Sequence, residues 1–565
     1  MSKRSLMLFV LCCFFVSTCV ASAAIPHLER HGSATRLIVH GEPFIMIAGQ
    51  VHNSSPSNLE YMEKVWAKLQ NLNLNTVIMP ISWELFEPEE GKFDYTLVDG
   101  LIRQARENDM KLVFLWFGSW KNGVSSYVPE WVKRDTVRFP RAEGSSNRNT
   151  KEILATFSEN NRNADAKAFV ALMQRIREID SEENTVIMVQ VQNELGIKPE
   201  IRDLSEEGDR RFAENVPQAL MEHLERNKDK LHPVMLERWG KSDFATTGTW
   251  SEVFGGSPHA DEVFSTWYYA LYVQYIAQLG KAEYPLPMFV NAWLADTPAS
   301  GTYPNGGPVA HMFDVWRAAA PAIDVFGPSI YMPDFKGVCA EYVWCGTNPL
   351  LIPEAHRGAC AAGRAYWAFG KHHALCFALF GIESTPDDHP IVDAYALLKQ
   401  AAPLIGAAQG TPRMTALFEQ DRGGTVRTVQ DESIPQVLSQ RQQVREETVV
   451  LGDWNVVVNY SEESLPRDAK PAALVIQSED DPEEFYILGQ GFEIGFGPRT
   501  PGPRNTHNLS VDMGRFENGR FVSELRLNGD ESGANWRARV PAFRTNLFLD
   551  PSKPRILRVR VHRFD

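Results

Sequence analysis

Eight short apolar segments separated by longer stretches constrain the fold of this chain more than any other feature. Each is rich in β-branched and aliphatic residues, as expected for strands that are buried on both faces of a parallel sheet. Helical periodicity lies between several of them, at 59–72, 98–108 and 164–179. This alternation predicts an α/β fold, a (β/α)8 barrel with insertions. The eight predicted strands are 44–52, 76–83, 111–118, 185–193, 288–293, 323–331, 350–354 and 374–382.

A doubly wound sheet is the alternative to the barrel, but no glycine-rich phosphate turn follows the first predicted strand. The longest insertion in the predicted barrel, 196–286, is polar at first and then helical.

A second domain is predicted after the barrel. After about residue 408 the sequence pattern changes to short alternating segments separated by Pro/Gly turns, which predicts a smaller all-β sandwich-like domain. Its predicted strands are 449–460, 473–477, 484–489, 520–527 and 556–561, and 496–503 is expected to be a turn.

The first residues resemble an export signal. Lys3 and Arg4 precede an apolar run at 6–16, and small residues follow at 20–23. This pattern predicts a secretory signal peptide at 1–23, so that the barrel occupies 24–408 and the β-domain 409–565. A lipoprotein site at Cys19 and a buried or membrane helix are the alternatives. The expected location is therefore outside the cytoplasm, in the periplasm or the extracellular space.

Net charge indicates which classes of partner are disfavoured, and the cysteines indicate which disulfides and metal sites can form. The formal net charge is −14 and no Lys/Arg cluster stands out, which argues against nucleic acid or an anionic membrane surface as a partner. Cys339 and Cys345 could form a disulfide across a small loop, or all four cysteines after the signal could be buried thiols. No C-x-x-C motif or His cluster indicates a metal site, and no cofactor is expected.

Polar and aromatic residues follow the predicted strands at the ends where such a barrel builds its active site. The strand 185–193 changes abruptly from apolar residues to Gln192, Asn193 and Glu194. The sixth and seventh strands end in Tyr331 and Glu354. The first three strand ends contribute His52, Asn53, Trp83, Glu84, Trp120 and Asn122. Tryptophan faces stack on a pyranose while amides and carboxylates bind its hydroxyls, so this mixture predicts a carbohydrate site.

Glu194 and Glu354 form a candidate catalytic pair. If their carboxyl groups lie about 5–5.5 Å apart, one attacks the anomeric carbon while the other protonates the leaving oxygen, and configuration is retained. The acid then needs a raised pKa, whereas the nucleophile must be ionised. Glu383, at the end of the eighth predicted strand, is the competing candidate for the nucleophile.

Three segments carry a family resemblance that covers most of residues 40–400. They are G-Q-V-H at 49–52, W-E-L-F-E-P-E-E-G-K-F-D at 83–94 and Q-V-Q-N-E-L-G at 190–196. Together they resemble glycoside hydrolase family 35, the β-galactosidases, within the clan of (β/α)8 retaining glycosidases. The resemblance implies a divergent bacterial branch with a C-terminal β-domain.

The resemblance also implies residue roles. Glu194 would be the acid/base, Glu354 the nucleophile and Asn193 the ligand of the sugar 2-hydroxyl, while Tyr331 would bond the nucleophile. Departures occur at Pro80, where the family has a tyrosine, at Trp83-Glu84 in place of W-N, and at 119–122 in place of A-E-W. They concern the sugar specificity more than the chemistry.

The leading hypothesis is a retaining exo-β-galactosidase that is exported and acts on terminal β-galactosyl residues of plant-type glycans. One alternative keeps the mechanism but changes the substrate, as a retaining endo-glycanase or a β-glycosidase of other specificity. The other is a non-catalytic carbohydrate-binding protein. No oligomeric state is predicted.

Overall fold

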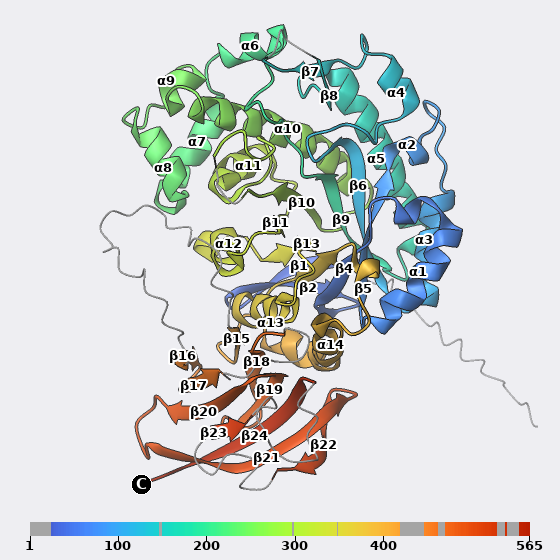
Figure 1. Ribbon diagram of the computed structural model, residues 1–565. Helices are drawn as coiled ribbons and strands as arrows, with labels where there is room; N and C mark the ends of the chain where they lie inside the picture. Colours follow the sequence, from blue (N-terminus) through green and yellow to red (C-terminus); the bar gives the residue numbers. More distant parts are fainter. Residues whose placement is uncertain are drawn as a thin grey trace, which may run out of the picture.

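The computed structural model describes residues 24–145, 150–295, 299–346, 348–418, 446–460, 469–527, 537–539 and 553–565 (Figure 1). The predicted signal peptide at 1–23 lies outside these residues. Within them, no helix combines the length and the apolar character needed to cross a membrane.

A parallel sheet of nine strands forms the barrel and confirms the predicted fold class. The strands occupy eight positions, because Pro353 divides the seventh into two short pieces. The first piece pairs with the eighth position and the second pairs with the sixth, so the sheet closes. Proline has no N–H to donate, which accounts for the interruption. The strands are β4 (Met46–Gln50), β5 (Thr76–Ser82), β6 (Lys111–Lys121), β9 (Val186–Asn193), β10 (Met288–Trp293), β11 (Val325–Ile330), β12 (Leu351–Ile352), β13 (Glu354–Ala355) and β14 (Cys376–Phe380).

Helices surround the barrel (Figure 1) and pack apolar residues against it. The first shows why: the Asn58 side chain accepts the Tyr61 N–H and begins the helix, and Met62, Trp66 and Leu69 recur at helical spacing on its buried face. The main helices are α1 (Leu59–Asn71), α3 (Thr96–Glu107), α5 (Glu159–Asp180), α10 (His259–Glu283), α11 (Phe313–Ala319), α12 (Phe335–Tyr342), α13 (Ala361–His372) and α14 (Pro390–Ala408).

Insertions extend the C-terminal end of the barrel. Short elements follow β5 and β6, namely α2 (Trp83–Phe86), α4 (Glu130–Arg134) and the hairpin of β7 (Arg141–Glu143) and β8 (Thr150–Leu154). The longest insertion follows β9 and is helical, as predicted. Its helices are α6 (Glu206–Phe212), α7 (Gln218–Arg226), α8 (Pro233–Gly240) and α9 (Trp250–Phe254), and it ends with α10.

A small antiparallel sheet, absent from the sequence prediction, precedes the barrel. It consists of β1 (His27–His31), β2 (Ala34–Val39) and β3 (Glu42–Phe44). Leu37 and Val39 pack in one cluster with the residues inside the barrel, such as Met46 and Ile78. This sheet therefore closes the N-terminal end of the barrel and leaves the C-terminal end for the site.

The C-terminal part consists of two antiparallel sheets, as predicted. One contains β15 (Met414–Phe418), β18 (Ala472–Gln477), β19 (Glu484–Gln490), β24 (Arg555–Phe564), β21 (Asn505–Glu517) and β22 (Arg520–Arg526). The other contains β16 (Glu446–Leu451), β17 (Trp454–Tyr460), β20 (Phe492–Pro498) and β23 (Arg537–Arg539). Two local predictions were wrong. The single strand predicted at 449–460 is the hairpin β16–β17, and the turn predicted at 496–503 begins inside β20, since Phe496 is a buried strand residue.

The two parts of the chain share one core. Phe418, Leu474 and Phe516 of the six-stranded sheet belong to the same apolar cluster as the residues of α13 and α14. The opposite face of that sheet packs against the four-stranded sheet through a second cluster that includes Phe485 and Phe496. The six-stranded sheet is therefore buried on both faces.

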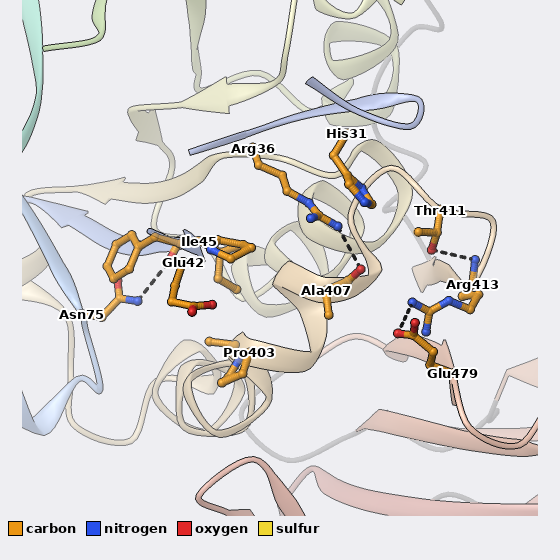
Figure 2. Close-up of a pocket in the computed structure, with 13 residues that line it drawn as sticks. His31, Arg36, Glu42, Ile45, Asn75, Pro403, Ala407, Thr411, Arg413 and Glu479 are labelled. Atoms are coloured by element: carbon orange, nitrogen blue, oxygen red, sulfur yellow. Dashed lines mark hydrogen bonds and ion pairs between the residues drawn. The ribbon is translucent and has the colours of Figure 1, made fainter. Parts of the chain in front are cut away.

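A cavity of about 710 Å³ lies where the N-terminal sheet, α14 and the β-domain meet (Figure 2). The Arg36 guanidinium donates to the Ala407 carbonyl at 3.0 Å, and Arg413 pairs with Glu479 at 2.9 Å. Ile45, one residue before β4, also lines the cavity. The cavity is thus at the N-terminal end of the barrel, opposite to the ends of the strands that carry the candidate carboxylates.

Candidate active site

Glu194 and Glu354 lie on the same rim of the barrel, at the fourth and seventh strand positions, with β10 and β11 between them in the sheet. Glu194 follows the last residue of β9, and Glu354 opens β13 in register with Ser329 of β11. Their side chains are only 4% and 3% exposed. Two carboxyl groups that are buried this deeply need specific partners, because burial disfavours the charged form.

Glu354 accepts hydrogen bonds at both oxygens. The Tyr331 hydroxyl donates to Oε2 at 2.8 Å, and the Gln50 amide donates to Oε1 at 3.1 Å. The Tyr331 side chain is 42% exposed, yet burial of its hydroxyl and the adjacent Glu354 carboxylate raise its pKa. The phenol therefore stays protonated as a donor. These two bonds fix the orientation of the carboxylate and stabilise its negative charge.

Glu194 is positioned by its backbone. Its N–H donates to the Asn291 Oδ1 at 2.8 Å, and its φ of 45° lies in the left-handed region. Gln192 and Asn122, with φ values of 64° and 55°, adopt the same region. Non-glycine residues in this conformation are strained and persist where the surrounding structure holds them. Three such residues, Asn122, Gln192 and Glu194, therefore lie at the end of β9 and beside it.

The environment of Glu194 favours its protonated form. Burial, and then the nearby Glu354 carboxylate, raise the pKa of Glu194 to about 7, while Lys121 and Ser329 act in the opposite direction. A carboxyl group with this pKa holds its proton through the mildly acidic range and can still release it near neutrality. The raised pKa of Glu194 suits it to the role of the acid.

Asn193 is held in a network of amides. Its Oδ1 accepts from Gln190 at 2.9 Å and from Asn291 at 3.4 Å. Its Nδ2 donates to the Asn122 Oδ1 at 3.2 Å, and the same oxygen accepts from the Lys121 ammonium at 2.8 Å. The structure therefore brings the predicted residues Asn122, Asn193 and Glu194 together in one cluster.

Asp165 of α5 connects the end of β6 to the end of β9. It accepts from the Trp116 indole at 2.7 Å, from the Gln192 amide at 2.7 Å and from the Ser119 hydroxyl at 2.5 Å. Burial raises the pKa of Asp165, and these bonds oppose that shift. Gln192 in turn accepts from the Trp120 N–H at 3.1 Å. This fully buried network supports the strained backbone before Glu194.

The structure places two predicted tryptophans in the core instead of the site. Trp83 is fully buried, and its indole donates to the Glu87 carboxylate at 2.8 Å. Trp120 is also fully buried, with its ring against Tyr269 and Tyr272 of α10. Neither ring has a free face on which a sugar can stack.

The remaining predicted residues lie at neighbouring strand ends. Glu84 forms an ion pair with Lys133 at 2.8 Å. The His52 N–H donates to Glu383 at 2.9 Å, and its ring bonds the Ser384 hydroxyl at 2.8 Å. Glu383, the competing nucleophile, thus holds the loop after β4. Within the described residues, the buried Asn53 Oδ1 has no hydrogen-bond partner.

Four contributors to the site were not among the predicted site residues, namely Gln50, Lys121, Asn291 and Ser329. Each is a polar residue in or at the end of an apolar strand, and each is buried. Buried polar side chains of this kind need partners, so their presence in strands was a usable signal. Among the described residues, no group of three or more His, Cys, Asp or Glu side chains is arranged to hold a metal ion.

The cysteine alternatives are partly resolved. Cys339 of α12 and Cys376 of β14 are buried free thiols, so Cys339 forms no disulfide. The side chain of Cys345 lies outside the described residues.

Comparison with known families gives two matches. Residues 53–262 match the family described as "Beta-galactosidase", glycoside hydrolase family 42, in place of the family 35 that the motifs indicated. Residues 391–539 match a domain of unknown function, DUF5597. No curated protein sequence matches the chain.

Solved structures with a similar arrangement include three β-galactosidases. The enzyme from Bacillus circulans sp. alkalophilus is 13% identical, with a TM-score of 0.44 over 64% of this chain and 57% of that chain. The enzyme from Halorubrum lacusprofundi is 16% identical, with a TM-score of 0.42 over 63% and 58%. The enzyme from Rahnella sp. R3 is 14% identical, with a TM-score of 0.40 over 64% and 57%. The chain spans less than two thirds of each of these proteins.

Proposed function

We propose that this protein is a retaining β-glycosidase that removes terminal β-galactosyl residues from oligo- or polysaccharides. The observation that carries the proposal is the buried pair of Glu194 and Glu354 on one barrel rim, with a raised pKa at Glu194 and two hydrogen-bond donors on Glu354. The match of residues 53–262 to a β-galactosidase family supports the same chemistry.

The proposed mechanism has two displacements. The Glu354 carboxylate attacks the anomeric carbon while Glu194 gives its proton to the departing glycosidic oxygen, and a glycosyl–enzyme ester forms. Glu194, now ionised, takes a proton from water, and the hydroxide equivalent attacks the same carbon and releases Glu354. The two inversions retain the configuration of the sugar.

Neighbouring residues have roles in this scheme. Tyr331 and Gln50 orient the nucleophile through the bonds described above. In this scheme Asn193 binds the sugar 2-hydroxyl, and a hydrogen bond there that strengthens in the transition state accelerates the reaction. The network around Asp165 has no contact with substrate in this scheme and acts by positioning.

Exo action is supported by the low exposure of both carboxylates. A groove for internal cleavage of a polymer would leave the two groups open to solvent along its length, whereas here they are 3–4% exposed. The match of residues 53–262 to a family described as β-galactosidase favours galactose as the sugar.

Export is part of the proposal. It rests on the basic residues, apolar run and small residues within 1–23, and it places the enzyme in the periplasm or the extracellular space, where plant-type glycans are met.

The decisive test compares aryl β-galactoside with aryl β-glucoside, β-xyloside and α-L-arabinoside. We expect the wild type to cleave the galactoside, Glu354→Ala to be inactive, and azide to restore turnover of Glu354→Ala with a glycosyl azide of inverted configuration. Cleavage of another glycoside alone would refute the sugar assignment. A Glu354→Ala variant as active as the wild type would refute the nucleophile, and a protein that binds sugars without cleaving any would be a carbohydrate-binding protein.

A further inference from the structure

Lys121, the last residue of β6, is a buried cation within the candidate site. Its side chain is 5% exposed, and its ammonium donates to the Asn122 Oδ1 at 2.8 Å. It also lies 5.2 Å from the centre of the Phe117 ring. Within the described ranges, no carboxylate oxygen lies within ion-pair distance of this ammonium.

A buried ammonium in this situation is incompletely solvated by the protein. It has three N–H donors, and one of them is used by the amide oxygen of Asn122. Removing a charge from water costs several kcal/mol unless hydrogen bonds and opposite charges replace the water. Two donors are therefore available to oxygen atoms that enter the site.

The position of the Lys121 ammonium indicates where a bound molecule would place the oxygen atoms that accept from it. The Asn122 oxygen that binds it also accepts from Asn193, the residue before Glu194. The charge is near enough to Glu194 to oppose the rise in its pKa. The ammonium thus lies near the carboxyl group that protonates the leaving oxygen in the proposed reaction.

We propose that Lys121 is a substrate-binding residue that donates hydrogen bonds to oxygen atoms of the sugar bound beside Glu194. This inference rests on the proposed function of the site. A neutral sugar supplies hydroxyl oxygens, whereas a uronic acid supplies a carboxylate, and either accepts from an ammonium. The choice between these two acceptors makes Lys121 a specificity determinant of the site.

A second consequence concerns the proton on Glu194. Lys121 stabilises the ionised form of this carboxyl group, so a neutral residue at position 121 makes Glu194 a weaker acid. The proton is then retained to higher pH. A residue with a purely structural role would not move the pH dependence in this direction.

The experiment measures kcat and KM against pH for wild type, Lys121→Met, Lys121→Arg and Lys133→Met. Lys133 is the matched control, since it is a partly exposed lysine that pairs with Glu84. We expect Lys121→Met to raise KM for the preferred glycoside about 10- to 100-fold and to move the basic limb of the profile to higher pH. Lys121→Arg should keep the wild-type pH profile. Lys133→Met should match the wild type in KM and in the pH profile.

Two substrates distinguish the acceptors. If Lys121→Met affects only the cleavage of aryl β-galactoside, the ammonium binds a hydroxyl. If the wild type prefers aryl β-galacturonide and the variant loses this preference, the ammonium binds a carboxylate. Circular dichroism and thermal unfolding show that each variant is folded. An active Lys121→Met with unchanged KM and unchanged pH profile would overturn the proposal while leaving the glycosidase intact.

Failure of the proposed function has a different signature, in which the wild type cleaves no aryl glycoside. Calorimetric titration with galactose and galacturonic acid then provides the readout. Binding by the wild type that is weakened at least tenfold in Lys121→Met, but not in Lys133→Met, supports the assignment of Lys121. No binding by the wild type, or equal binding by both, overturns it.

Discussion

Glu194 is the residue whose proton the proposed reaction depends on, and its pKa of about 7 predicts the alkaline limit of activity. As acid it must be protonated when the first bond breaks, so kcat/KM should fall as pH rises through about 7. Glu194→Gln cannot give a proton and should lower kcat about 10²- to 10⁴-fold and abolish this limb. A pH–rate profile of both proteins tests this, and a wild-type profile that is flat from pH 6 to 9 would contradict it.

The same residue predicts an effect on stability. Because the folded-state pKa of Glu194 is raised above 4.5, its contribution to stability is complete below that pH and is lost as pH rises through about 7. At pH 8 the wild type must bury this carboxylate beside Glu354, whereas glutamine is neutral. Glu194→Gln should therefore raise the free energy of unfolding by about 1–3 kcal/mol at pH 8, and the difference should vanish near pH 4.

Urea unfolding at both pH values provides the measurement, with Glu63→Gln as the control, since Glu63 is exposed on α1. A gain for Glu194→Gln that is equal at pH 4 and pH 8 would mean that burial of the charge is not its cause.

Single residues also show what the sequence could and could not predict. Glu194, Glu354, Asn193 and Tyr331 follow from one rule, that the ends of barrel strands meet at one rim. Trp120 was misplaced because β6 continues to Lys121, three residues beyond the predicted end at Gly118. The longer strand places the Trp120 ring against α10, in the layer between barrel and helices. Strand length at a rim depends on the neighbouring strands, which the local sequence does not reveal.

At the scale of elements, the turn after β9 predicts how the site depends on its neighbours. Gly196 has a φ of 138°, and a Cβ there would lie 2.6 Å from the carbonyl carbon of Pro304 in the loop after β10. The backbones of Ile197 and Asn305 also bond each other, at 2.9 and 2.8 Å. The loop after β10 therefore sits directly on the segment that carries Glu194.

Gly196→Ala should separate these segments. We expect the free energy of unfolding to fall by at least about 1–3 kcal/mol and kcat to fall about 100-fold, because a displacement of about 1 Å at the acid is enough for that loss. Gly255→Ala is the control, since Gly255 has a φ of 82° but open space around its Cβ position. Denaturant unfolding and steady-state kinetics should show a stability loss without a kcat loss for Gly255→Ala. Equal kcat for both variants would contradict the argument.

Element boundaries were predictable to different degrees. The barrel strands were found because apolar runs flanked by turns identify them, and β10 was predicted with its observed bounds, Met288–Trp293. The sheet β1–β3 was missed because its burial alternates irregularly, and only Leu37 and Val39 among its residues are fully part of the interior cluster, with Leu28 and Phe44 partly buried against it. In the β-domain, β16 and β17 were merged because the two-residue turn at Gly452 and Asp453 is shorter than the window in which a strand pattern is recognised.

For the whole molecule, the shared core predicts that the two parts unfold together. Phe418 is buried against the Cα of Gly363 in α13, where an added Cβ would lie 2.3 Å from its ring. Phe418→Ala should lower the free energy of unfolding by about 3–5 kcal/mol, and scanning calorimetry should still show one transition at a lower midpoint. Phe496→Ala, which empties the core between the two β-sheets, is the matched control.

Thermal inactivation of glycosidase activity distinguishes the two variants. Phe418→Ala should shorten the half-life of the site on heating more than Phe496→Ala does, since Phe418 packs on a barrel helix. Two separate calorimetric transitions in the wild type would show that the parts are independent.

Helix α14 and the sheet that covers it bear on how such a protein can be rearranged by recombination. The match to the second family begins at residue 391, inside α14, and the Phe516 N–H of β21 donates to Gln400 of the same helix at 3.3 Å. A genetic crossover in the turn at 409–413 would separate the helix from its cover and bring an aliphatic surface into water. The turn at 409–413 is thus a poor site for a domain boundary in a chimeric protein. The barrel and the β-domain are best transferred, fused or diversified together.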